Sequence, residues 1–247
     1  MVLRRAVFVF VLAAGACGDD GGAAIDAPVV DMVVPVDFDN GSCGNMLRFT
    51  GEYVDWDSQT SFCGIFNAVI EVAGGGAMDS TAPNGRFDLC IPDAPTTRLD
   101  VMQPAGNSQC TVPAAAYTVP TIFIANKDVI LSGAMFSGRA FTTERQTSFF
   151  QDQVGAAFDP AKAQVFVHVS GSAQTVTLAA AHGPAQVATA TGWEAGDTGT
   201  DVFFPNVDVG GGTTQLTVSN STAGTGAIPL VAGTITNVTV GVVSPGL

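Results

Sequence analysis

The sequence predicts an all-β fold of two β-sandwich units, and three observations lead to that prediction. The 247-residue chain is 47% hydrophobic and 13% charged, which is enough apolar material for one large domain or two small ones. Val, Thr, Gly and Phe are plentiful while Leu and Lys are scarce, as in proteins built from short strands and glycine-rich turns. Apolar and polar residues alternate after position 45, which is the period of half-buried strands.

The first residues have the layout of a secretory signal. Arg4 and Arg5 give a basic start, apolar residues follow from Ala6 to Ala14, and small residues end at Cys17. The run is shorter than the roughly 20 apolar residues that span a bilayer, so a retained transmembrane helix is the weaker alternative. The segment resembles a bacterial lipoprotein signal, although Ala14 stands where leucine is usual.

That resemblance implies cleavage after residue 16, acylation of Cys17 and export to the cell envelope, with the outer membrane as the expected location. Two or more acyl chains anchor a protein stably. The alternative is an ordinary signal peptide, which leaves Cys17 in a soluble secreted product. Residues 17–44 are rich in Asp, Gly, Ala and Pro and are expected to form a disordered acidic tether. Its self-repelling aspartates are Asp19, Asp20, Asp26, Asp31, Asp37 and Asp39.

With Cys17 lipidated, the remaining cysteines form an even set in an exported chain and predict two disulfides. They are Cys43, Cys63, Cys90 and Cys110. Three pairings are possible, and we favour Cys63 with Cys90 and Cys43 with Cys110. A zinc site is disfavoured, because no short C-x-x-C spacing occurs and neither histidine is close to a cysteine in the sequence.

A first β-sandwich is expected over residues 45–131. Its strands are predicted at 47–54, 65–72, 86–91, 98–102 and 116–124. The segment from Pro83 to Gly85 has turn chemistry, and the strand after it places Phe87, Leu89 and Ile91 on one face.

Gly51, the run at 68–72 and the Thr81–Leu89 segment, in this order, resemble the carboxypeptidase regulatory-like domain, and they cover about a third of the chain. The resemblance implies a transthyretin-like, or Ig-like, β-sandwich. It implies no catalytic residues, because such domains are non-catalytic partners of peptidases or modules of surface proteins.

A connector is expected at 132–158 and a second β-sandwich at 159–247. Thr143 is predicted to cap a short helix over 144–154 whose aromatic stripe packs in the core. Strands are predicted at 163–169, 175–178, 202–210, 214–218, 227–233 and 234–243, with a loop at 192–199. Residues 204–210 and 231–236 also look like later strands of the same family. A tandem pair of sandwiches is therefore preferred, with one fused larger sandwich as the alternative.

Catalytic motifs are absent from the sequence. It has no G-x-S-x-G elbow, H-E-x-x-H helix or P-loop, so no cofactor, metal centre or enzymatic activity is expected. His168 alternates with Val167 and Val169 and is interpreted as a hydrogen-bonded or outward strand residue. His182 lies in a turn without a carboxylate spaced to orient it.

Two loops contain acidic residues beside a tryptophan. Asp55 and Asp57 flank Trp56, and they are weak candidates for calcium ligands. Trp193 is followed by Glu194, Asp197 and Asp201, a second weak group. Solvated turns are the better interpretation for both loops, and burial at a sandwich end is favoured for the tryptophans over an exposed binding platform.

The net charge of -13, with nine scattered Lys and Arg residues, argues against a nucleic-acid partner. We expect a non-catalytic envelope lipoprotein that displays β-sandwich modules to a protein or glycan. The alternative is a secreted accessory module or a hydrolase with an unrecognised active site, in which acidic residues converge on His168 or His182. Possible glycosylation sequons at Asn220 and Asn237 carry little weight in a bacterial protein.

Overall fold

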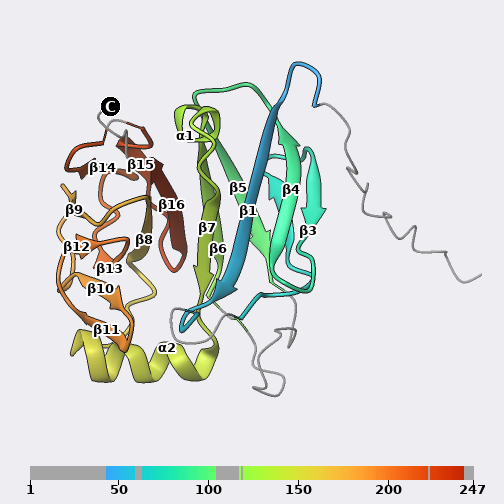
Figure 1. Ribbon diagram of the computed structural model, residues 1–247. Coiled ribbons are helices and arrows are strands. Elements are labelled where there is room, and N and C mark those ends of the chain that lie inside the picture. Colours follow the sequence, from blue (N-terminus) through green and yellow to red (C-terminus); the bar gives the residue numbers. More distant parts are fainter. Residues whose placement is uncertain (1–42, 59–62, 104–116, 118, 222, 242–247) are drawn as a thin grey trace, which may run out of the picture. The chain divides into compact units, whose positions relative to one another are not determined.

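Strands dominate the computed structural model, which describes residues 43–58, 63–103, 117, 119–221 and 223–241 (Figure 1). These residues all belong to one compact unit, Pro35–Leu247. Their strands form sheets of nine, four and three strands that pack face to face. The predicted all-β sandwich fold is therefore confirmed. Among the described helices, none has the length and apolar character needed to cross a bilayer. The signal, the tether and Cys17 lie outside the described residues.

The nine-stranded sheet contains strands from both halves of the chain. Its order is β11 (Gly192–Ala195), β10 (Gln186–Thr189), β13 (Asp201–Val207), β8 (Ala163–Ser170), β16 (Ile235–Gly241), β6 (Thr121–Asn126), β5 (Thr96–Met102), β2 (Val69–Val72) and β3 (Met78–Ser80). The parallel pairing of β16 with both β8 and β6 joins the halves. The large sheet thus contains strands from both before and after the expected connector.

The two smaller sheets cover opposite faces of this large sheet. The three-stranded sheet has the order β4 (Arg86–Ile91), β1 (Leu47–Asp55) and β7 (Phe136–Ala140), with β1 and β7 parallel. The four-stranded sheet has the order β12 (Thr198–Gly199), β9 (Gln174–Leu178), β14 (Thr213–Val218) and β15 (Gly226–Pro229). Residues alternate across β6: Phe123 packs with the three-stranded sheet, whereas Ile122 and Ile124 pack with the four-stranded sheet.

We call these surfaces the aromatic face and the aliphatic face. The aromatic face carries Phe123, Phe166, Phe203, Asn237, His168 and Asp201, which the strand register places side by side. The aliphatic face carries Ile122, Ile124, Val165, Val167, Val202, Phe204, Val238 and Val240. The sequence interpretation that His168 shares a face with Phe166, opposite Val167, is confirmed.

Strand β7 lies between β1 and β16 (Figure 1), at the edge of its own sheet. Its outer N–H groups have no strand partner, so side chains of β16 accept from them instead. Ser137 N donates to Thr239 Oγ1 (3.1 Å) and Arg139 N donates to Asn237 Oδ1 (2.8 Å). This satisfies backbone donors that would be costly to bury unpaired. Asn237 is therefore a fully buried structural residue, not an accessible glycosylation site.

The expected domain boundaries, 131 and 159, stay a prediction. The strand pairing across residues 132–158 favours the fused-sandwich alternative over two independent domains. Two separate apolar clusters nevertheless form, one rich in Phe beneath the three-stranded sheet and one rich in Val beneath the four-stranded sheet.

The contacts of the turn that precedes β4 explain why Thr81 and Gly85 suit their positions in the Thr81–Leu89 segment. Thr81 Oγ1 donates to Ile65 O (2.6 Å) and accepts from Ala68 N (2.9 Å), which ties the turn to the start of β2. Gly85 has a φ of +75°, and a Cβ there would meet Tyr53 O at 2.3 Å. Only glycine combines this left-handed backbone with so close an approach.

The favoured disulfide pairing is wrong. Cys43 is bonded to Cys90, with their Cα atoms 5.5 Å apart. The reason is register: Arg48 of β1 lies opposite Cys90 of β4, so the chain just before β1 passes the same end of β4. Cys63 is also disulfide-bonded, and Cys110 lies outside the described residues.

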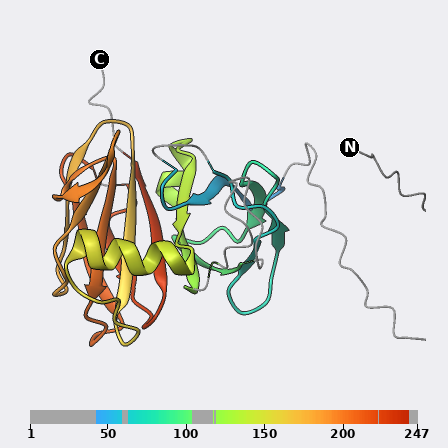
Figure 2. The same cartoon turned by 90° about the horizontal axis from the view of Figure 1, so that it is seen from below.

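The connector contains more structure than expected. Within it β7 precedes helix α2 (Thr143–Phe149), which continues as a π-helix, η1 (Phe150–Val154), and the short helix α1 (Lys127–Leu131) lies just before the connector. The predicted cap was one residue late, because it is Thr142 whose hydroxyl accepts from Arg145 N (3.0 Å) and whose backbone is extended. The predicted loop at 192–199 forms β11 and β12 instead, and β11 places Trp193 in the apolar core. Seen from below, the helix crosses the ends of the second-half strands (Figure 2).

Candidate functional site

A buried ionic network is the most chemically distinctive feature of the aromatic face. Asp201 begins β13, directly opposite His168 on β8, and Arg139 reaches them from β7. The side chain of Arg139 is 7% exposed, that of Asp201 is 10% exposed and that of His168 is 26% exposed. Asp201 Oδ1 lies 2.6 Å from His168 Nδ1, and Asp201 Oδ2 accepts from Arg139 Nη2 at 2.5 Å.

The surroundings of Arg139 account for its burial. Its Nη1 donates to Trp56 O (3.1 Å), and its guanidinium carbon lies 5.6 Å from the ring centroid of Phe166 and 5.9 Å from that of Trp193. The planar guanidinium thus stacks against aromatic rings while it neutralises Asp201. A buried charge of this kind is tolerated because it is both paired and hydrogen-bonded.

The network fixes the charge of Asp201. Burial alone would raise its pKa, but the hydrogen bond from His168 and the charge of Arg139 outweigh burial and hold the pKa below the ordinary value of 3.8. The carboxylate is therefore ionised throughout the neutral range. Its negative charge is shared between two cation-forming side chains, which ties β7, β8 and β13 together.

This arrangement contains one element of acid–base catalysis, a carboxylate that orients a histidine. The sequence interpretation had separated them, because it placed Asp201 in the loop after Trp193. The missed signal is phase: Asp201 is in step with Phe203, and His168 is in step with Phe166, so both polar residues interrupt the same aromatic face. Arg139 was not singled out, since it lies in the expected connector, where the sequence analysis predicts no strand.

Both tryptophans are buried, as favoured from the sequence. Trp56 is 0% exposed and Trp193 is 6% exposed, and their rings stack with centroids 4.5 Å apart. The rings of Phe141, Phe149 and Phe203 surround Trp56. This aromatic cluster joins β1, the helix and the second-half strands, so it packs the interior and offers no exposed platform.

The acidic side chains proposed as weak calcium ligands have protein partners. Asp55 Oδ1 accepts from Asp57 N (3.1 Å) and Asp55 Oδ2 accepts from Tyr117 Oη (3.0 Å). Asp57 forms a two-pronged ion pair with Arg145. Burial raises the pKa of Asp55 above its ordinary value. In the described part of the chain, no group of three His, Cys, Asp or Glu residues is placed to hold a metal ion.

The other candidates are scattered. Asp201 is held in the network, Glu194 is exposed on β11, and Asp197 accepts from Thr198 Oγ1 (3.1 Å). His182 Nδ1 lies 2.6 Å from Gly183 O, and its ring packs edge-on against Phe204 with centroids 4.8 Å apart. Of the two histidines, only His168 contacts a carboxylate among the described residues.

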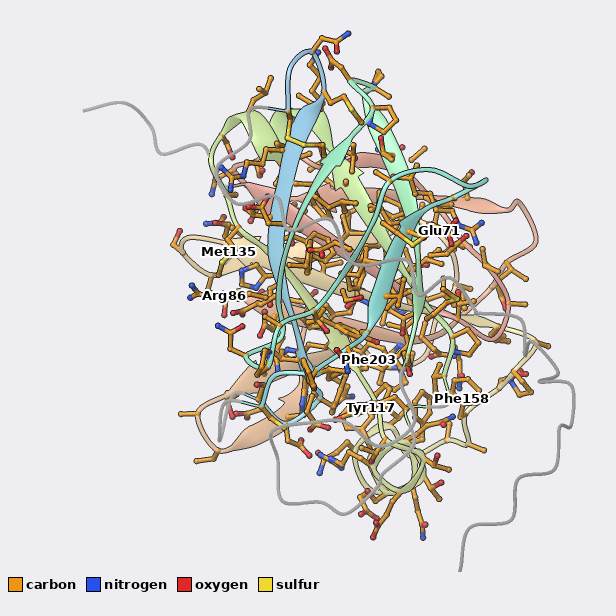
Figure 3. The ribbon with its side chains drawn as sticks, turned by 90° about the vertical axis from the view of Figure 1, so that its right-hand side faces the viewer. Glu71, Arg86, Tyr117, Met135, Phe158 and Phe203 are labelled. Atoms are coloured by element: carbon orange, nitrogen blue, oxygen red, sulfur yellow. A yellow bond between two sulfur atoms is a disulfide. The ribbon has the colours of Figure 1, made fainter. Side chains whose placement is uncertain are left out.

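Surface cavities lie elsewhere on the described part of the chain. The first, of about 550 Å³, is lined by α2, η1 and residues 155–158. The others lie beside α1, over the β1–β4 pair near Met135 and Arg86, and beside Tyr117. Figure 3 labels Met135, Arg86, Tyr117 and Phe158. Neither histidine lines any of these four cavities.

Comparisons with known proteins give little. No family model matches the chain, and no curated protein matches its sequence. Among solved structures, the shaft pilin SpaA from Lactobacillus rhamnosus GG aligns with 82% of this chain and 100% of its own, at 6% identity and a TM-score of 0.19. A likeness this weak carries no argument about fold or function.

Proposed function

We propose that the chain is a non-catalytic lipoprotein of the bacterial cell envelope that displays a β-sandwich for interaction with a protein or glycan. In this proposal Cys17 carries the lipid that anchors the chain to the outer membrane, and residues 17–44 form an acidic tether. The sequence around Cys17 and the aspartate-rich segment after it support the location. The carboxypeptidase regulatory-like resemblance supports a display module without chemistry of its own.

The proposal that the chain is non-catalytic rests on the contacts of the Asp201 carboxylate. Its two oxygens are committed to His168 and Arg139, and all three side chains connect strands of the interior. A carboxylate neutralised by a buried guanidinium is poorly suited to stabilise a histidine that gains a proton during a reaction. The network is therefore interpreted as a structural tie between β7 and the large sheet.

The acidic surface favours a protein or glycan partner over a nucleic acid. Among the described residues, six Lys and Arg side chains form ion pairs with Asp. Most of the cations that a nucleic acid would need are thus already neutralised, and a polyanion would meet a net negative surface.

Intact mass tests the proposal. Native chain extracted from membranes is compared with Cys17→Ala and with Cys43→Ala, all expressed in the same host. We expect wild type and Cys43→Ala to begin at Cys17 and to carry acyl mass, and Cys17→Ala to lack it. Cys43→Ala controls for loss of a cysteine as such. An unmodified wild-type chain in the soluble fraction would contradict the anchor.

The second candidate function, a secreted hydrolase, is favoured by one observation, the 2.6 Å contact between His168 Nδ1 and Asp201 Oδ1. It requires His168 Nε2 to act as a base on a bound substrate. A panel of ester and peptide substrates is assayed with wild type and His168→Asn. Turnover by wild type that His168→Asn abolishes would establish the hydrolase and overturn the non-catalytic proposal.

A further inference from the structure

The cavity over α2 and η1 differs from the surface around it in having no charge. Its lining residues are Gln146, Thr147, Phe150, Gln151, Gly155, Ala156, Ala157 and Phe158, none of which is ionisable. The chain as a whole carries a net charge of -13, and Glu144 and Asp152 lie on the same helix outside the lining. A charged ligand would find no opposite charge here, so the lining fits an uncharged ligand.

Two phenylalanines form the apolar part of this cavity. Phe150 is buried and Phe158 is half-buried, and their rings meet edge to face with centroids 5.4 Å apart. Figure 3 labels Phe158, above the helix that is seen end-on. Gly155 ends the π-helix at a φ of +67°, and a Cβ there would contact nothing within 4 Å, so the lining is open at this residue. Phe158 is itself partly exposed and can be reached by a ligand.

Uncharged polar groups complete the lining. The side-chain amides of Gln146 and Gln151 make no hydrogen bond within the described part of the chain, whereas Thr147 Oγ1 donates to Thr143 O at 3.2 Å. A glutamine amide both donates and accepts, so two of them can take the N–H and the C=O of a trans amide, which lie on its opposite sides. The π-helical turn that positions these residues is a feature often found at functional sites.

We propose that this cavity binds an uncharged N-acetylated sugar. An acetamido group presents one donor, one acceptor and a methyl group, which match the glutamine amides and the Phe158 ring. The volume of about 550 Å³ lies within the range of ligand pockets, roughly 300–1,000 Å³. A peptide is a poorer match, because none of the lining residues lies on a strand whose edge a peptide would extend. The inference deepens the glycan-binding arm of the proposed function and rests on it.

The test titrates tri-N-acetylchitotriose into the full chain, extracted from membranes in detergent, by calorimetry. We expect saturable binding that weakens about three- to tenfold in Gln151→Ala, since one hydrogen bond is lost. Gln153→Ala is the matched control, because Gln153 is an exposed glutamine of the same π-helix that does not line the cavity. Phe158→Leu keeps apolar volume but removes the ring, and it should weaken binding while the circular dichroism spectrum stays unchanged.

Three outcomes would overturn the inference. The first is no binding of tri-N-acetylchitotriose at millimolar concentration. The second is equal binding of maltotriose, which lacks acetamido groups, or of an acetylated alanine tripeptide amide. The third is binding that neither Gln151→Ala nor Phe158→Leu changes. The fraction in which the chain is recovered reports on the anchor at Cys17 independently, so failure of the sugar titration is distinguishable from failure of the proposed function.

Discussion

The two faces of the nine-stranded sheet solve the same packing problem differently. The aliphatic face meets a complete sheet of four strands, and its buried residues are mostly Val, Ile and Leu. The aromatic face meets an edge, β7, whose N–H groups and Arg139 must be satisfied inside the protein. Polar residues occur on the aromatic face because backbone N–H groups of the edge strand β7 have no strand partner there. These donors are buried, so side chains of the large sheet must accept from them.

The largest expected effect comes from breaking the polar network. Asp201→Ala leaves Arg139 buried without its counter-charge and should lower the free energy of unfolding by about 3–5 kcal/mol. Chemical denaturation followed by tryptophan fluorescence measures it. A loss below about 1 kcal/mol, the range of exposed ion pairs, would mean that the aromatic face does not depend on this tie.

The three-stranded sheet, which covers the aromatic face, also carries the Cys43–Cys90 disulfide, whereas the four-stranded sheet contains no cysteine. The double variant Cys43→Ala with Cys90→Ala should lose about 2–4 kcal/mol, mainly because the unfolded chain gains freedom over a separation of 47 residues. Thermal and urea unfolding measure the loss. Wild type unfolded under reducing conditions should lose at least as much stability as the variant, because reduction also opens the disulfide of Cys63, and unchanged stability in both would contradict a stabilising role.

Acid should remove the contribution of Asp201. Because the folded pKa lies below 3.8, the stability it gives is complete above the unfolded value and is lost as pH falls through the folded pKa. The difference in unfolding free energy between wild type and Asp201→Asn should shrink as the pH falls below 3.8. The raised pKa of Asp55 has the opposite sign but is present in both proteins, so it cancels. A difference that grows on acidification would contradict the assignment.

The aliphatic face should respond to volume alone. Ile124→Val removes one buried methylene and should cost about 0.5–1.5 kcal/mol, with no dependence on pH. Urea denaturation at pH 7 and at pH 4 measures both quantities. A pH-dependent cost would show that the two faces are coupled electrostatically.

The smallest effect is expected at the surface. Arg48 and Asp88 form an ion pair on the outer side of β1 and β4, with the Arg48 side chain 50% exposed. Arg48→Ala should lower the free energy of unfolding far less than Asp201→Ala does, because solvent screens the pair. The same denaturation assay places it beside Asp201→Ala. Similar losses in the two variants would contradict the distinction between buried and exposed pairs.

The difference between the faces also explains what the sequence predicts. Alternation correctly assigned His168 and Val167 to opposite faces, because period two reports which side of a strand each residue occupies. It carries no information on which strands pair. The β6–β16 pairing, the Cys43–Cys90 bond and the meeting of Arg139 with Asp201 all join residues far apart in the sequence, and the local pattern at each is compatible with several partners.

Calorimetric unfolding tests most directly the central claim, that the shared sheet and the polar network make both halves one structure. We predict a single transition for the full chain, with equal calorimetric and van't Hoff enthalpies. Two transitions, of which only one shifts when the Cys43–Cys90 bond is reduced, would contradict the claim and establish two independent β-sandwiches joined at the connector.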